Sequence, residues 1–196
     1  MKEKLNLRNA ILWTVALAAL ILFFASFGAT ARLRGTIPEE SYYVDMKCVN
    51  AIWGCKSIWG YVEGHYSGSF LNKAVANVPG LIGAILLLLA AGGIVAVTFL
   101  IKDEKLNKIL TFVCGGVILV SGVLFFFVSE APWYVLKESL VEEGIGGVDI
   151  KTIKQMYSGM KTSSGYGIGG GIFAILLAGG VIASQLIPNV QFIKSK

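Results

Sequence analysis

Four long apolar stretches, none of which contains Asp, Glu, Lys, Arg or His, dominate this sequence. Each has roughly 18–22 residues, which is enough for an α-helix to cross about 30 Å of hydrocarbon. Because the inside of a bilayer offers no water to the backbone, each stretch must form its hydrogen bonds internally, as a helix. Strands of a membrane barrel would alternate polar and apolar residues, and these stretches do not. The sequence therefore predicts an all-α membrane protein built on a four-helix transmembrane bundle.

The composition is typical of a chain that lies partly within a lipid bilayer. Of the 196 residues, 55% are hydrophobic and 15% are charged, and the charged residues lie in blocks between the apolar stretches. The formal net charge of +5 comes largely from lysines beside those stretches. Such lysines are typical of membrane proteins. We therefore expect the lipid bilayer as a partner, and no nucleic acid.

The basic residues predict the orientation of the chain. Eight of the 17 Lys and Arg residues lie in the two tails and in the short link between the second and third stretches. They are Lys2, Lys4, Arg8, Lys102, Lys105, Lys108, Lys194 and Lys196. The other nine are spread over two long loops. Since short cytoplasmic segments are enriched in Lys and Arg, both termini are predicted to be cytoplasmic, in a multi-pass protein of the plasma membrane.

This orientation defines the expected segments along the chain. They are a tail at 1–9, spans at 10–27, 80–101, 109–128 and 167–187, outer loops at 28–79 and 129–166, a cytoplasmic link at 102–108 and a tail at 188–196. A cleaved signal peptide is the alternative for residues 1–31, because Ala29-Thr30-Ala31 resembles a cleavage site. The apolar stretch of about 18 residues exceeds the usual 7–15 of a signal, which favours a retained span.

Two cysteines in the first outer loop predict a disulfide. Cys48 and Cys55 lie on the oxidising side of the membrane, where a bridge between them would close a small ring worth roughly 2–3 kcal/mol. The alternating residues 42–47 just before them predict a strand. We therefore expect a small, partly β extracytoplasmic domain held by this disulfide. A redox-active pair is the alternative, although catalytic dithiols usually have the closer C-x-x-C spacing.

Aromatic residues of the two outer loops form a candidate interaction surface. The residues are Trp53, Trp59, Tyr61 and Trp133. Trp and Tyr dominate the energetics of many protein interfaces. They also form small hydrophobic cores and belts at the membrane surface, so both interpretations remain open.

The loops also contain helical patterns. Residues 70–78 predict a short amphipathic helix before the second span. In the second outer loop, residues 132–143 predict a helix that ends at Gly144, Gly146 and Gly147. Asp149 is a candidate cap for a further helix. That helix would place one apolar face on Ile153, Met156, Tyr157 and Met160.

Glycines at small-xxx-small spacing predict close helix packing in the spans. The candidates are Gly92, Gly93, Gly165, Gly167, Gly169, Gly171, Gly179 and Gly180. They fit packing within one bundle, or an exposed face that binds a second copy or another membrane protein.

Catalytic and metal-binding patterns are absent from the sequence. His65 is the only histidine, which excludes a histidine-rich metal centre in one chain. The spans lack the charged groups that proton relays and ion pathways need. We therefore expect no enzymatic activity, no metal and no cofactor.

The segment Ile52-Trp53-Gly54-Cys55 is similar to the Gly-Leu-Trp and Cys motif of the claudin, PMP22 and SUR7-type tetraspan proteins. The order of spans and loops also resembles that group, whereas the cysteine partner, Cys48, lies upstream instead of downstream. The resemblance implies a role in adhesion, barrier formation or membrane organisation through the outer domain. Two other hypotheses stay open. They are an accessory subunit of a transporter, channel or secretion complex, and a membrane thiol-disulfide oxidoreductase.

Overall fold

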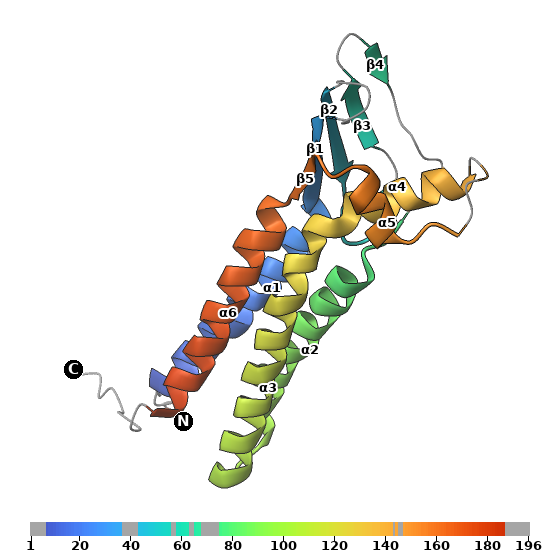
Figure 1. The fold of residues 1–196 in the computed structure, drawn as a ribbon. Coiled ribbons are helices and arrows are strands. Elements are labelled where there is room, and N and C mark those ends of the chain that lie inside the picture. The colour runs from blue at the N-terminus through green and yellow to red at the C-terminus, as the bar shows by residue number, and fades with distance from the viewer. Residues whose placement is uncertain are drawn as a thin grey trace, which may run out of the picture.

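The computed structural model describes residues 7–36, 43–55, 58–62, 65–67, 75–142, 144 and 147–186. Four long helices form a bundle, and a sheet lies at one end of it (Figure 1). The helices are α1 (Leu7–Ala25), α2 (Val78–Leu100), α3 (Glu104–Phe125) and α6 (Gly165–Leu186). All four are long and apolar enough to cross a membrane. The prediction of a four-span, mostly helical membrane protein is confirmed.

The four helices pack in the cyclic order α1, α2, α3 and α6. Contacts join α1 to α2 and α6, and join α3 to α2 and α6. Most buried side chains on the inner faces are small or branched, and Phe23 and Phe125 are the large aromatic ones among the described residues. The Ser121 hydroxyl, fully buried on α3, donates to the Gly83 carbonyl oxygen of α2 at 2.6 Å. This bond joins a side chain of α3 to the backbone of α2 inside the apolar interior.

Side-chain caps determine where two of the spanning helices begin. The Asn77 Oδ1 atom accepts a hydrogen bond from the Gly80 N–H at 2.8 Å, and Pro79 occupies the first turn of α2, where its missing N–H is harmless. The Asp103 Oδ1 atom accepts from the Leu106 N–H at 2.9 Å. Because of this cap, α3 begins at Glu104, and the predicted link at 102–108 contains its first turn.

One antiparallel sheet joins the two long loops. Its strands are β1 (Thr30–Thr36), β2 (Tyr43–Val49), β3 (Ile58–Val62), β4 (His65–Ser67) and β5 (Met160–Ser163), in the order β4-β3-β2-β1-β5. The predicted strand at 42–47 corresponds to β2. A short turn, η1 (Ser26–Gly28), leads directly from α1 into β1. Because β5 comes from the second loop and pairs with β1, the two loops form a single domain.

Three shorter helical segments lie beside the sheet (Figure 1). They are η2 (Phe126–Glu130), α4 (Ala131–Glu142) and α5 (Ile150–Met156). The predicted helix at 132–143 is confirmed over its described residues. Asp149 caps α5 as predicted, since its Oδ1 accepts from the Thr152 N–H at 2.7 Å. Met160 does not extend the face of α5: the helix ends at Met156, and Met160 begins β5.

The predicted helix at 70–78 is wrong in its described part. Val75 forms a bridge with Cys55, through backbone hydrogen bonds of 3.0 and 3.2 Å. Asn77 then serves as the cap of α2, and Val78 is the first residue of that helix. Backbone pairing with the first loop therefore replaces helix formation at 75–77. Residues 70–74 lie outside the described residues.

The sheet has one apolar face that packs on the rest of the molecule. Ala31, Leu33, Met46 and Cys48 alternate along β1 and β2 and are buried, with exposed fractions of 6% or less. Helix α4 packs against both strands. This shared core fixes the sheet against the helical segments at the end of the bundle.

Candidate interaction surface

The predicted disulfide between Cys48 and Cys55 is present. Both cysteines are fully buried, and their Cα atoms lie 5.6 Å apart. The bridge closes the turn that follows β2, in which Asn50 has a φ of 59° and Gly54 a φ of 145°. Such positive φ values favour Asn and Gly. The disulfide thus holds a tight turn in place, with its sulfur atoms away from solvent.

That turn positions Trp53 against the end of α1. The Trp53 Nε1–H donates to the Ser26 Oγ at 2.8 Å. Its ring stacks on Phe27, with centroids 4.6 Å apart, and meets Phe23 edge-on at 5.9 Å. Trp53 therefore connects the first loop to the first span, and is partly buried.

The other predicted contact residues lie in different places. Trp133, on α4, is only 4% exposed and belongs to the core beneath the sheet, so its side chain offers little surface to a partner. Trp59 and Tyr61 lie on β3, at register positions opposite Lys47 and Asp45. The structure therefore does not bring the four aromatic residues together on one surface.

Polar contacts join helix ends and the sheet where the bundle meets the loops. Asn77, 1% exposed, donates through Nδ2 to the Phe127 carbonyl oxygen at 2.8 Å. The Ser164 hydroxyl donates to the Thr30 carbonyl oxygen at 2.7 Å, and the Tyr166 hydroxyl donates to the Leu22 carbonyl oxygen at 2.8 Å. These bonds satisfy backbone carbonyl groups of α1, η2 and β1, and the Ser164 bond connects the sheet to the start of α6.

The face of the sheet opposite the core carries charges. We call Arg32, Arg34, Asp45, Lys47 and Lys161 the charged face. In the register, Arg32 lies opposite Lys47, and Arg34 lies opposite Asp45 on one side and Lys161 on the other. The Arg34 Nε lies 3.2 Å from the Asp45 Oδ2, and these side chains are 46% and 32% exposed. Four cations and one carboxylate thus share one surface.

Sequence reasoning missed this surface, although a signal for it exists. Polar Thr30, Arg32 and Arg34 alternate with apolar Ala31 and Leu33. Such alternation is typical of a strand with one buried and one solvated face. It predicts that both arginines lie on the solvated face. It does not predict that Lys161, from the second loop, lies beside Arg34 on the same face.

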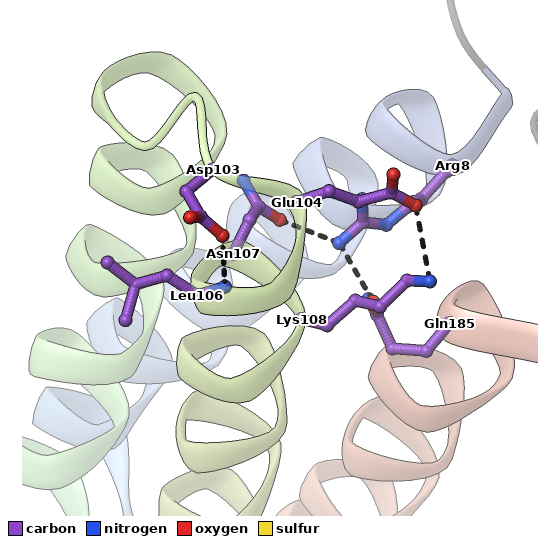
Figure 2. Close-up of polar contacts among 7 residues, drawn as sticks. All are labelled: Arg8, Asp103, Glu104, Leu106, Asn107, Lys108 and Gln185. Carbon is purple, nitrogen blue, oxygen red and sulfur yellow. Dashed lines mark hydrogen bonds and ion pairs between the residues drawn. The ribbon is translucent and has the colours of Figure 1, made fainter.

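A buried polar cluster lies at the opposite end of the bundle (Figure 2). Arg8, 9% exposed, donates through Nη2 to the Asn107 Oδ1 at 2.6 Å and to the Gln185 Oε1 at 2.8 Å. Asn107 in turn donates through Nδ2 to the carbonyl oxygens of Val97 and Ile101, at 2.9 and 3.2 Å. The cluster therefore connects α1, α3 and α6 with the end of α2.

The predicted packing glycines divide into two groups. A Cβ atom added to Gly167, Gly171, Gly93 or Gly180 would meet a neighbouring helix at 2.9–3.3 Å. Gly171 approaches the Gly122 carbonyl oxygen, so that α3 and α6 touch through their backbones. Nothing lies within 4 Å of a Cβ added to Gly92, Gly165, Gly169 or Gly179. The first group packs helices within the bundle, and the second lies on its outer surface.

Among the described residues, no group of three or more His, Cys, Asp or Glu side chains could hold a metal ion. No protein-family model and no curated protein matches this chain.

Proposed function

We propose that this chain is a non-catalytic tetraspan protein that contacts other proteins through its sheet domain, in membrane organisation or adhesion. One observation carries the proposal: both long loops build a single sheet, tied to the spans and solvated on its charged face. A domain fixed in this way holds a contact surface at a set angle to the membrane. Pre-ordering of that kind lowers the entropy cost of binding.

The sheet lies on the extracellular side in this proposal, and both termini are cytoplasmic. Lys102, Lys105 and Lys108 are exposed at the end of the bundle opposite the sheet. This clustering supports the cytoplasmic assignment of that end. The disulfide in the first loop supports the extracellular assignment of the other end, because disulfides persist in oxidising compartments.

The arrangement also supports a claudin-like role. A small sheet and a disulfide lie between the first and second spans, and the second loop adds to the same domain. Burial of both sulfur atoms favours a structural disulfide over a thiol-exchange site, because exchange requires a thiolate to reach a sulfur.

An accessory subunit of a membrane complex is the second candidate. Gly165, Gly169 and Gly179 lie on the outer surface of α6, where another helix could approach closely. In that case the lipid-facing surface, and not the sheet, would be the main contact.

Site-specific photocrosslinking in intact cells separates the two candidates. A photoreactive residue replaces Thr36, which is exposed on β1, in one variant, and Leu176, which is exposed on α6, in a second variant. Crosslinks to protein from Thr36 are expected if the sheet domain makes the contact. Crosslinks from Leu176 alone would favour the accessory subunit and contradict the proposal.

Orientation is tested with an impermeant maleimide on the same cells. Lys161→Cys should react and Lys105→Cys should not, in a background that lacks Cys114. Protection of Lys161→Cys together with reaction of Lys105→Cys would reverse the proposed topology.

A further inference from the structure

We propose that the charged face binds an acidic polypeptide segment of a partner protein. This inference rests on the proposed function, because it assigns a partner chemistry to the same sheet domain. Its evidence is the placement of Arg32, Arg34, Lys47 and Lys161 on three adjacent strands, with Asp45 among them.

Among the described residues of the two loops, positive charge is concentrated on the charged face. Outside the charged face, the described residues of the two loops have three cations and four carboxylates: Lys137, Lys151, Lys154, Glu130, Glu138, Glu142 and Asp149. The charged face alone has four cations and one carboxylate. Solubility alone does not require positive charges to be gathered on one surface, because a surface with interspersed charges of both signs keeps a protein equally soluble. The excess of three positive charges on this face therefore favours binding of an anionic partner.

The spacing fits one extended segment. Neighbouring strands lie about 4.8 Å apart, so one acidic segment can reach Lys161, Arg34 and Lys47 together. Arg34 and Lys161 are exposed, while Arg32 and Lys47 are half-buried. A half-buried side chain has fewer accessible rotamers than an exposed one, which reduces the entropy lost on binding a carboxylate.

Asp45 makes a polypeptide the better occupant than a uniform polyanion. A polysaccharide or phosphate polymer of even charge would be repelled where Asp45 meets Arg34. A polypeptide can place a neutral or basic side chain there. Tyr43 and Val49, on the same face of β2, are 40% and 42% exposed and offer apolar contacts that only a mixed ligand would use. A second copy of the chain is disfavoured, because two such faces repel one another.

Binding is measured with the full-length protein in nanodiscs of phosphatidylcholine. The probe is a fluorescein-labelled random copolymer of Glu and Tyr, which combines carboxylates with apolar rings. The wild-type protein should bind it saturably, more tightly at low than at high salt. The double variant Arg32→Gln/Lys47→Gln should weaken binding about tenfold or more, which corresponds to about 1.4 kcal/mol.

The matched control is Lys137→Gln/Lys151→Gln, which removes the same charge from α4 and α5. It should change the affinity less than about twofold, because these lysines lie outside the charged face. If the first double variant fails to fold, Lys161→Gln takes its place, since its exposed side chain is not needed for packing. Asp45→Asn should raise the affinity for heparin, a uniform polyanion, more than for the copolymer.

In the binding measurement, three results would overturn the inference. They are no saturable binding by the wild-type protein, an equal loss in the control variant, and tighter binding of heparin than of the copolymer. Failure of the proposed contact role can be told apart from failure of this inference. If the sheet domain made no protein contact, crosslinks from Thr36 in cells would be absent. Crosslinks that persist unchanged in Arg32→Gln/Lys47→Gln would leave the contact role intact and refute only the acidic partner.

Discussion

The Arg8 guanidinium donates a hydrogen bond of 2.6 Å to the Asn107 Oδ1 and so joins the first turn of α1 to α3 at the end of the bundle opposite the sheet (Figure 2). The Asn107 Nδ2 also donates hydrogen bonds to two carbonyl oxygens at the end of α2. One amide side chain therefore satisfies groups from two other helices. A helix end without such partners would leave polar groups in an apolar environment.

Asn107→Ala is expected to lower the free energy of unfolding by about 2–3 kcal/mol, because it removes hydrogen bonds to a cation and to buried carbonyl groups. Unfolding is followed by titration with sodium dodecyl sulfate in mixed micelles. Lys105→Ala, on an exposed side chain of the same turn, should change the value by no more than about 0.5 kcal/mol. Equal effects of the two substitutions would show that the buried cluster does not hold the helices together.

Gly171→Ala is expected to destabilise the protein by about 1–3 kcal/mol. The new Cβ would lie 2.9 Å from the Gly122 carbonyl oxygen, and a backbone atom can move only if α3 and α6 separate. Gly169→Ala is the control two residues away, where a Cβ meets nothing within 4 Å. It should be neutral or slightly stabilising, because alanine favours helix formation. Thermal unfolding in the same micelles compares the two, and a destabilising Gly169→Ala would contradict the assignment of faces.

Trp53→Ala is expected to cost about 3–5 kcal/mol, because it removes a large ring that stacks on Phe27 and contacts Phe23. Ser26→Ala removes only the acceptor of the indole N–H and should cost about 1 kcal/mol. Chemical or thermal unfolding of both variants gives the comparison. If Trp53→Ala were no more costly than Ser26→Ala, Trp53 would be a surface residue and not the link between loop and span.

Cys48→Ala/Cys55→Ala is expected to lower the free energy of unfolding by about 2–3 kcal/mol, because the unfolded chain gains freedom when the ring is opened. In the folded wild-type protein, burial of both sulfur atoms should slow reduction by dithiothreitol. Mass spectrometry after alkylation measures the reduced fraction with and without denaturant. Fast reduction of the folded protein would favour the redox-active alternative.

The Asp149 cap makes the stability of helix α5 depend on pH. The hydrogen bonds from Thr152 lower the pKa of Asp149 from its ordinary value of 3.8. Because the folded-state pKa is the lower one, the cap stabilises α5 above about pH 4 and loses this effect as the pH falls through the folded-state pKa. Hydrogen exchange of α5, compared with that of Asp149→Asn at each pH, should show the loss in the wild-type protein alone. Asn also caps helices but does not titrate.

Local patterns predicted much of this protein. The four spans follow from the length and uniform apolarity of their sequences, since a helix is the structure that satisfies their backbone in lipid. The Asp149 cap and strand β2 could also be predicted, because a helix cap and an alternating strand depend on only a few neighbouring residues. The pairing of Cys48 with Cys55 also required no distant contact.

The features that could not be predicted depend on contacts between residues that are distant in the sequence. Arg8 looks like a charge of the tail in the sequence, and only the approach of Asn107 and Gln185 makes it a buried junction. Gly169 and Gly171 have equivalent spacing, yet one faces outward and the other faces α3. The rotation of each helix is set by packing with its neighbours, which small-xxx-small spacing does not contain.

The sheet shows the same division between local and distant information. The alternation around Arg32 indicates a strand, but β5 pairs with β1 across more than a hundred residues. That pairing brings Lys161 beside Arg34 and creates the charged face. The spans, the Asp149 cap and the disulfide could be predicted from the sequence, because each depends on residues that are close together in the chain. Which polar side chains share a surface depends on the fold, because the pairing of distant strands sets their register and distance.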